Sequence, residues 1–559
     1  MKNIFKKFGY AAFLAGVFAS CNKIDVPVTS ELTPDTYPKT EAQFNSVMGP
    51  VYTLLRSEYA TTYFFLQDQT TDEALLPIFG ADWIDGNKYL ETHRHTWTKD
   101  NGIVGSGWYY CANLVGTTNQ TIFIVNKSPE GAVKNTSMAE LKTMRALFFY
   151  MWMDMYGNVP LDTTYGSTEL KANASRTQVF NFIESELKAS LPYLKTASGA
   201  TTYGKPTKYM AYALLAKLYL NAEVYTGTQR YNECIVACDS VINAGGGSQY
   251  AIEPRASYLA QFAPTNGPAM KEFIYAIPFD ASTSNGYMFY ARYDLNRNLG
   301  IRYNYSGSTA GTNVDPVMNL TTGNGLVNNK PSGPRCTTDE FYAKVSNDAN
   351  DIRNKQWLSG LQYWANGNPI KVKTTNLGYD QFYTGATPAG SYEYHLNILP
   401  LGVSRLGAGS YDLGKDEIAW NTGVRNIKFL ADYTNITSRN QNNDVPILRF
   451  SDIILMKAEA IQRGGTATAG HTALSLVNLL RAQRTTSAAL TSVTLEDIYT
   501  ERCKEMTWEC WHRNDMIRFG KYESSYGLAK TNADTYRRIF PIPTTAMATN
   551  PKLVQNPGY

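Results

Sequence analysis

The chain has 559 residues, a formal net charge of +4 at neutral pH and 13% aromatic side chains, including 39 tyrosines. So small a charge on so long a chain leaves no electrostatic footprint for nucleic acid, which excludes nucleic-acid binding as a function class. After the first 20 residues no segment reaches eighteen uninterrupted apolar residues, so the sequence predicts no transmembrane helix in the mature chain.

Residues 1–20 have the pattern of a secretory signal peptide. Three lysines precede an apolar run over about residues 10–19, which is too short to span a bilayer. The letters FASC, ending at Cys21, look like a bacterial lipobox and predict cleavage before that cysteine and its lipidation. The alternative is an ordinary signal peptide beside a chance cysteine. Two or three acyl chains would hold the mature chain, residues 21–559, firmly on a membrane.

Helical periodicity dominates the first part of the mature chain, over about residues 40–250. One apolar stripe covers residues 139–155, and Ser175 is the predicted N-cap of a second helix that ends at Leu194. Residues 208–245 contain two further predicted helices. The first of them is apolar on nearly all sides and is therefore expected to be buried.

The same pattern returns over about residues 445–525. Residues 451–484 form a predicted helix pair with the length of one tetratricopeptide unit, and residues 497–519 are again helical. Acids and arginines alternate in this last segment at the spacing of ion pairs that fix a scaffold. Paired helices cannot bury their faces alone. We therefore predict a mostly α fold in which tetratricopeptide-like helix pairs form a right-handed helical scaffold.

Between these blocks, residues 251–444 change in character. Gly, Asn, Tyr, Ser and Thr dominate, and hydrophobic periods are short or absent. Long irregular segments are uncommon unless they are functional, and binding residues concentrate on loops held by a rigid scaffold. We predict that this region is a loop-rich insertion that faces the ligand, within a single domain over residues 21–559.

The sequence shows no catalytic or metal-binding motif. It lacks a GxSxG elbow, a GxxxxGK[ST] loop and an HExxH motif, and the six cysteines besides Cys21 form no CxxC pair. His93 and His95 would share one face of an extended strand, but no third ligand accompanies them. Residues 346–357 lack the Gly and Glu of an EF-hand loop and are predicted to cap a short helix. We therefore expect no enzyme activity, no metal and no cofactor.

One polar loop raises a separate question. In the stretch DWIDGN, Trp83 lies between Asp82 and Asp85, and Gly86 and Asn87 follow with no helical stripe around them. A tryptophan in such a loop has two interpretations. Either the loop folds back and buries the indole, or the indole is displayed for a flat, hydrated ligand.

Several stretches together resemble one family, the SusD/RagB outer-membrane lipoproteins. The closing segment over residues 536–559, YRRIFPIPTTAMATNPKLVQNPGY, is similar to the family's C-terminal signature. NDVPILRFSDIILMKAEAIQRGG, over residues 443–465, and ERCKEMTWECWHRNDMIRFGKYE resemble the blocks before it. The resemblance covers the chain from the lipobox to Tyr559.

The resemblance implies a cell-surface protein held by lipid on the outer membrane and acting as a lid over a SusC-like, TonB-dependent transporter. Such proteins bind an oligosaccharide, or less often a peptide, and pass it to the transporter. They are not enzymes. The signal, the helical blocks, the abundant tyrosine and the irregular insertion are consistent with this expectation.

The resemblance also places the DWxDG loop at the glycan-binding face. Trp83 would then supply a stacking platform, with Asp82, Asp85 and Asn87 as its polar rim. By analogy with the stacking of nucleobases, one platform contributes on the order of 1–3 kcal/mol. Further aromatic candidates from the insertion are listed here by chemistry and position: Tyr287, Tyr290 and Trp364. Six other tryptophans are expected to pack internally: Trp97, Trp108, Trp152, Trp357, Trp508 and Trp511.

Three functions therefore remain open from the sequence. The first is a surface glycan-binding lipoprotein that serves a transporter. The second is a protein-interaction scaffold, or lid of the transporter, with peptide or no direct glycan binding. The third is a glycoside hydrolase, which would require two carboxylates about 5–10 Å apart across a cleft. An exposed arc of aromatic planes beside acids or amides would favour the first over the second.

Overall fold

The structure is a computed structural model that describes residues 37–80, 82–282, 290–295, 333–363, 369, 371–374, 383–386, 392–403, 409–414, 418–430, 432 and 440–559. The predicted signal peptide, Cys21, Tyr287 and Trp364 lie outside these residues.

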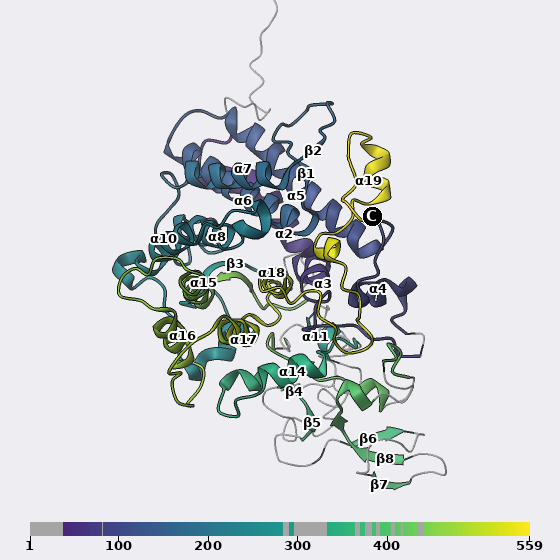
Figure 1. Ribbon diagram of the computed structural model, residues 1–559. Coiled ribbons are helices and arrows are strands. Elements are labelled where there is room, and N and C mark those ends of the chain that lie inside the picture. The colour runs from purple at the N-terminus through teal and green to yellow at the C-terminus, as the bar shows by residue number, and fades with distance from the viewer. Residues whose placement is uncertain are drawn as a thin grey trace, which may run out of the picture.

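Two helical blocks form the body of the molecule (Figure 1). The first block contains α2 (Glu41–Glu58), α3 (Phe64–Gln67), α4 (Lys88–Arg94), α5 (Gly102–Asn126), α6 (Ala132–Tyr156), α7 (Arg176–Ser190), α8 (Lys208–Leu220), α9 (Ala222–Thr226) and α10 (Tyr231–Ile242). The second block contains α15 (Phe450–Gln462), α16 (Ala473–Arg481), α17 (Leu495–Met506), α18 (His512–Arg518) and α19 (Thr544–Thr549). Helix α15 lies beside α8 and α10, so the two blocks pack as one continuous stack of helix pairs.

Local sequence explains where these helices begin. The Ser175 hydroxyl accepts a hydrogen bond from the Gln178 backbone N–H, and the Ser175 N–H donates to Gln178 Oε1, which completes a capping box. The predicted N-cap of α7 is therefore confirmed. Helix α8 is buried on nearly all sides, as its apolar composition predicted. The mostly α fold with paired helices is confirmed.

The strands are short: β1 and β2 lie between α6 and α7, and the others belong to the irregular region or close it, together with two α-helices in its described part. The strands are β1 (Val159–Pro160), β2 (Asn173–Ala174), β3 (Phe273–Ile277), β4 (Trp357–Leu358), β5 (Gly360–Leu361), β6 (Lys371–Thr374), β7 (Tyr383–Ala386), β8 (Tyr392–His395), β9 (Asn397–Ile398), β10 (Arg425–Asn426) and β11 (Val445–Arg449). The helices are α11 (Tyr290–Asp294) and α14 (Asp339–Val345). All strand pairs are antiparallel, in the orders β1-β2, β10-β4, β11-β3, β5-β9 and β6-β8-β7.

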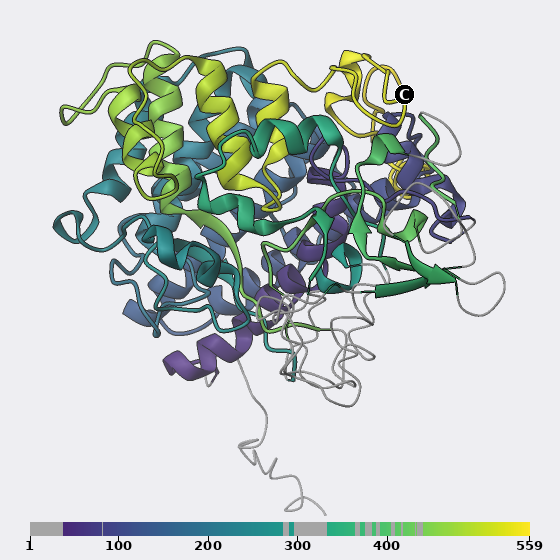
Figure 2. The same cartoon turned by 90° about the horizontal axis from the view of Figure 1, so that it is seen from below.

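The pair β3–β11 joins the two ends of this insertion. Val445 pairs with Ile277 and Arg449 with Phe273, and both strands are buried throughout. Helix α15 starts directly after β11. The insertion therefore leaves the helical scaffold and returns to it at one place. Its three-stranded sheet β6-β8-β7 lies at the lower right of Figure 1, and Figure 2 shows the same sheet from below.

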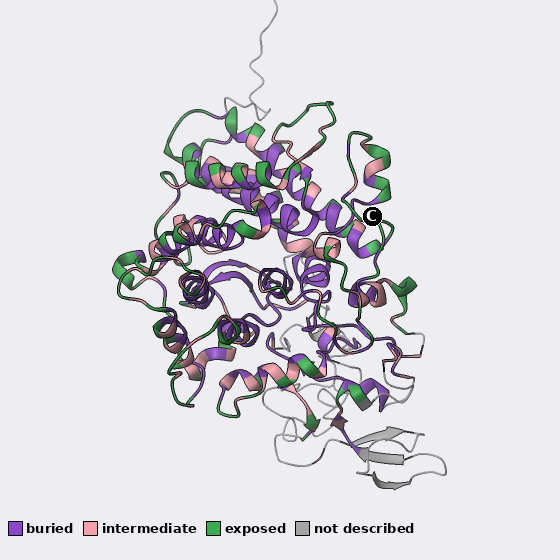
Figure 3. Cartoon of the chain, in the orientation of Figure 1, coloured by how far each residue is buried: buried purple, intermediate pink, exposed green. Residues whose placement is uncertain are grey.

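Buried residues line the inside of the helical stack (Figure 3) and most of them form one large core, while a smaller apolar cluster joins the insertion to residues 75–79. The smaller cluster consists of Leu75, Ile78, Phe79, Cys336, Leu401, Tyr411, Leu413, Ala419, Trp420 and Leu528. All six tryptophans that were predicted to pack internally are buried.

A buried ionic network connects the insertion to the scaffold. Its centre is Glu505 on α17, whose carboxylate oxygens lie 2.9 Å from Arg449 Nη1 on β11 and 2.9 Å from Arg484 Nε. Arg353 from the insertion lies 3.1 Å from the same carboxylate. Glu272 pairs with Arg449 and Arg484 from the opposite side. These side chains are almost completely inaccessible to water.

A second network ties helices of the two blocks together. Asp452 on α15 lies 2.5 Å from Lys217 Nζ on α8 and 2.9 Å from Arg502 Nη1 on α17. Arg502 continues to Asp515 on α18 at 2.8 Å, and Asp515 contacts Arg518 at 2.7 Å. The alternating acids and arginines therefore form inter-helix ion pairs, as the sequence predicted.

The predicted helix over residues 497–519 is wrong in one respect, because the structure breaks it between α17 and α18. Trp508 and Cys510 adopt left-handed backbone conformations, with φ of 62° and 65°. Two buried carboxylates hold this turn: Glu73 accepts the Trp508 N–H, and Asp68 accepts the Cys510 N–H at 3.0 Å. Tertiary hydrogen bonds from a distant segment have overridden the local helical period.

The central position of Glu505 gives the first prediction. Replacing Glu505 by Gln removes the charge that three buried arginines share, and breaking a buried pair in this way costs roughly 3–5 kcal/mol. We expect Glu505→Gln to lower the free energy of unfolding by about that amount, as measured by urea denaturation. Glu496→Gln on the same helix is the control. Its exposed pair with Lys521 predicts a loss of at most about 1 kcal/mol, and equal losses in both variants would contradict the role of the network.

Candidate functional site

The loop around Trp83 has an unusual backbone. Phe79 and Asp82 exchange backbone hydrogen bonds of 3.0 and 3.1 Å, which fold the chain into a tight turn. Beyond this turn Trp83, Asp85 and Asn87 have φ values of 65°, 37° and 65°. A left-handed conformation costs a non-glycine residue about 1–2 kcal/mol. Such strain persists only where the surroundings over-determine the backbone, and it concentrates at binding and active sites.

The insertion fixes the base of this loop. Asp412 Oδ1 accepts the Gly80 N–H at 2.7 Å, and Ile78 exchanges backbone hydrogen bonds with Tyr411 and Leu413 at 2.9 and 2.8 Å. The Phe79 ring stacks on Trp420 with centroids 4.4 Å apart and an angle of 16° between the rings. Hydrogen bonds from the insertion and packing in the smaller apolar cluster therefore fix the residues that precede the loop.

Trp83 is neither fully buried nor fully exposed. Its ring packs at an angle of 64° against Tyr293 of α11, with centroids 5.7 Å apart, and at 49° against Tyr89 of α4 at 6.4 Å. The Arg292 guanidinium lies 5.8 Å from the same ring. The structure thus combines the two interpretations of the sequence, because part of the indole is anchored and part is accessible.

The polar rim predicted around Trp83 is present at the surface. Asp82, Asp85 and Asn87 are all exposed. Lys88 Nζ lies 3.6 Å from Asp85 Oδ2 in a pair that is itself open to solvent. Surface pairs of this kind are worth only about 0–1 kcal/mol, so the Asp85 carboxylate can exchange Lys88 for a ligand hydroxyl at little cost.

Among the predicted aromatic partners of Trp83, Tyr290 needs correction. Its ring is fully buried against Phe64 and Phe429, with the Arg335 guanidinium 4.9 Å from its centroid, so it offers no surface to a ligand. Tyr293, three residues further along α11, is the one that contacts Trp83. The chain alternates tyrosines too closely in this stretch for sequence to decide which one faces the loop. Tyr287 and Trp364, the other two candidates, lie outside the described residues.

His93, His95 and the six described cysteines are buried. His93 and His95 lie at the end of α4, not on a strand, and their Nε2 atoms bond to the carbonyl oxygens of Gly527 and Thr70. No group of three metal-ligating side chains occurs in the described part of the chain. Cys503, His512 and Asp72 do line up, with Cys503 Sγ 4.0 Å from His512 Nδ1 and His512 Nε2 2.7 Å from Asp72. All three are buried, and burial raises the pKa of the Cys503 thiol well above its usual range, which favours the thiol over the nucleophilic thiolate.

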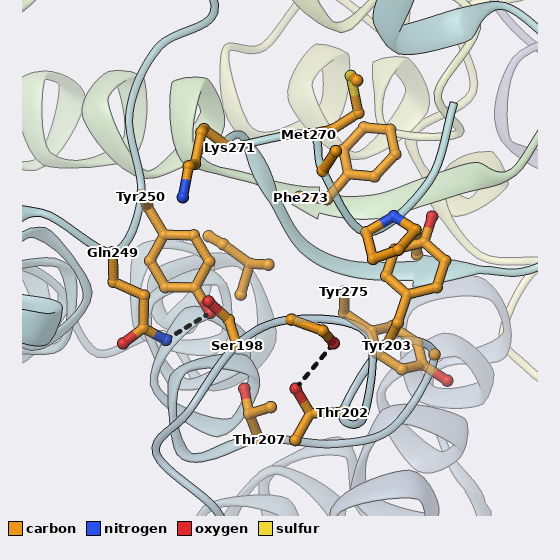
Figure 4. Close-up of a pocket in the computed structure, with 16 residues that line it drawn as sticks. Ser198, Thr202, Tyr203, Thr207, Gln249, Tyr250, Met270, Lys271, Phe273 and Tyr275 are labelled. Carbon is orange, nitrogen blue, oxygen red and sulfur yellow. Dashed lines mark hydrogen bonds between the residues drawn. The ribbon is translucent and has the colours of Figure 1, made fainter. Parts of the chain in front are cut away.

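Three hollows lie away from the Trp83 loop. One, of about 130 Å³, lies between β3 and the turn before α8 (Figure 4). Tyr203 and Tyr250 line it, and the Tyr203 hydroxyl donates to Asp444 at 2.6 Å. Burial raises the pKa of the Asp444 carboxyl to about 6. A hollow this narrow cannot hold an oligosaccharide. The second, of about 330 Å³, is lined mainly by apolar side chains of α8 and α10, and the third lies between α2 and α6.

In the described residues, no helix is long and apolar enough to cross a membrane.

Comparison with known proteins extends these observations. The family described as "SusD family" matches residues 271–559, and one described as "Starch-binding associating with outer membrane" matches residues 31–220. The chain is 23% identical to the starch-binding protein SusD of Bacteroides thetaiotaomicron, over all of this chain and 99% of that protein. It is 24% identical to the SusD-like protein P25 of Formosa agariphila, over 79% of this chain and 77% of that one.

Solved structures show the same fold. Surface glycan-binding protein A from Bacteroides thetaiotaomicron, in complex with laminarihexaose, aligns with a TM-score of 0.64 and 18% identity over 93% of this chain and all of that chain. A SusD superfamily protein from Parabacteroides distasonis aligns with a TM-score of 0.64 and 16% identity, again over 93% of this chain and all of that one. Because the family match covers more than half of its residues, the chain belongs to the SusD family.

Proposed function

We propose that this protein binds an oligosaccharide at the bacterial cell surface through the loop around Trp83. The observation that carries the proposal is a partly buried indole in a strained loop whose neighbouring positions, Asp82, Asp85 and Asn87, are exposed carboxylates and an amide. Two similar proteins bear names that report starch binding or a laminarihexaose complex, which supports a carbohydrate as the ligand class.

The geometry suggests how a sugar would bind. A pyranose ring has a face of C–H groups that packs on an aromatic plane and a rim of hydroxyls that donates to oxygen acceptors. Trp83 supplies the plane, and Asp82, Asp85 and Asn87 supply acceptors around it. One stacking platform contributes on the order of 1–3 kcal/mol. Because one platform alone is weak, we expect affinities in the millimolar to micromolar range, about −4 to −8 kcal/mol. Weak binding suits a protein that must release its ligand.

We further propose that the chain is lipidated at Cys21 and delivers its ligand to a SusC-like, TonB-dependent transporter in the outer membrane. The signal-like residues 1–20 and the lipobox support the anchor. The family description "associating with outer membrane" over residues 31–220 supports the location. Binding without catalysis completes this function. Release of reducing sugar by the purified protein would overturn that part.

One observation favours a second candidate, a protein-interaction scaffold or transporter lid with peptide or no direct glycan binding. The hollow between α8 and α10 is almost entirely apolar, and Val236 at its rim is 62% exposed. Exposed apolar patches of this kind mark contacts with other proteins. The two candidates separate in one measurement. Calorimetry of the mature chain without Cys21 against a panel of neutral polysaccharides detects binding under the first and none under the second.

The role of Trp83 gives the second prediction. Trp83→Ala removes the platform, and losing about 1–3 kcal/mol weakens binding roughly 5- to 150-fold. In affinity electrophoresis the variant should no longer be retarded by the polysaccharide that retards the wild type. Tyr193→Ala, which removes an exposed aromatic ring far along the scaffold, is the control and should migrate as the wild type does. Retention of Trp83→Ala in the gel would remove this residue from the site.

Gly86 gives the third prediction, which tests whether the loop must be held in shape. Its φ is +66°, and a Cβ atom placed there meets nothing within 4 Å. Gly86→Ala therefore adds no clash and costs only the left-handed penalty, about 1–2 kcal/mol. We expect weaker glycan binding in calorimetry with little change in unfolding temperature. Gly116→Ala, in the helix interior and equally open, should leave binding intact. Unchanged binding in Gly86→Ala would show that the loop conformation is not needed.

A further inference from the structure

A small surface hollow between the start of α2 and the start of α6 contains an unexplained acid. Its volume is about 140 Å³, close to the roughly 150 Å³ of an engineered cavity that admits a benzene ring. The lining side chains come from α2, from α6 and from the chain after α7. The polar ones are Glu41, Asn45, Thr136, Ser137, Glu140 and Lys195.

Glu140 is the feature that distinguishes this hollow. Its side chain lines the hollow although the residue is only 4% exposed, and Oε2 has no hydrogen-bond partner among the described residues. The hydroxyl of nearby Tyr52 is also sealed from solvent without a partner there. A buried carboxylate without a partner costs several kcal/mol, so protein acids that are buried this deeply are normally paired, as Glu505 is.

In the structure the two neighbouring lysines bind other partners, and neither forms an ion pair with Glu140. Lys195 Nζ lies 2.7 Å from Glu41, and Lys205 Nζ donates to Asn45 Oδ1 at 2.9 Å. Burial is the main reason why the pKa of Glu140 is raised to about 7; Lys205 and Lys195 lower it, and Glu41 makes a small contribution that raises it. Burial therefore favours the protonated form of this carboxyl more than in an exposed glutamate.

We propose that this hollow is a second ligand site, and that it takes the primary ammonium group of a small hydroxylated molecule such as an amino sugar. An ammonium has three donors and no acceptor. Glu140 supplies the charged acceptor. The Thr136 hydroxyl gives its proton to the Tyr193 carbonyl at 3.2 Å, so its lone pairs remain available. A charge-assisted hydrogen bond of this kind contributes about 1.5–3 kcal/mol.

Other ligand classes fit this hollow less well. A metal ion requires several ligating side chains, and no metal-binding group of three was found in the part of the chain that the structure describes. An anion would meet the Glu140 carboxyl, and Lys195 is already paired with Glu41. A neutral sugar would fill the volume but would leave Glu140 without a cationic partner. An ammonium group supplies both the positive charge and the hydrogen-bond donors that the Glu140 carboxylate lacks.

The fourth prediction tests this site with glucosamine and glucose, which differ in one amino group. Calorimetry of the mature chain without Cys21 at pH 7 should show glucosamine binding roughly 10- to 100-fold more tightly than glucose. Repeating the titration in two buffers of different ionisation enthalpy should show proton release from Glu140, because the ligand binds the carboxylate form. This second measurement requires no variant and is independent of any folding defect.

Variants then locate the binding. Glu140→Gln keeps the size of the side chain and should abolish the preference for glucosamine and the proton release, with circular dichroism confirming the fold. Glu130→Gln, on the exposed surface before the same helix, should change neither. Equal binding of the two sugars, no proton release, or unchanged glucosamine affinity in Glu140→Gln would each overturn the proposal.

Discussion

The interaction on which the rest of the structure depends is the buried meeting of Glu505 with Arg353, Arg449 and Arg484. Each arginine comes from a different part of the chain, and Arg353 belongs to the irregular insertion. Burial opposes ionisation of Glu505, but Arg484 and Arg449 hold its pKa well below the usual range. The buried charge of Glu505 is therefore compensated only when all of these segments are folded together. We infer that the scaffold and the insertion fold cooperatively.

One segment of the chain, residues 68–83, connects the buried scaffold to the surface loop. At its start Asp68 and Glu73 bind the backbone of the turn between α17 and α18. Its middle pairs with the insertion through Leu75 and Ile78. Its end is the strained loop that carries Trp83. Since the start of the segment is buried in the scaffold and its middle in the insertion, the loop cannot relax without disturbing both.

The helical blocks were predictable from the sequence because their signals are local. The apolar stripe of α6 and the N-cap of α7 at Ser175 depend only on residues within one or two helical turns. The break at Trp508 was not predictable, because its cause is a pair of acids more than 400 positions earlier in the chain. The same reason explains Tyr290 and Tyr293. Both lie on α11, and only tertiary packing decides that one enters the core while the other supports Trp83.

The half-buried state of Trp83 is what a stacking platform requires. A fully exposed indole would lose side-chain freedom on binding, and each side chain that becomes ordered at an interface costs about 0.5–1.5 kcal/mol. That cost is comparable with the stacking energy itself, about 1–3 kcal/mol. The contacts of Trp83 with Tyr293 and Tyr89 restrict the ring before any ligand arrives. The indole is thus ordered when the protein folds and not when the ligand binds. The stacking energy therefore contributes to affinity with little loss to side-chain ordering.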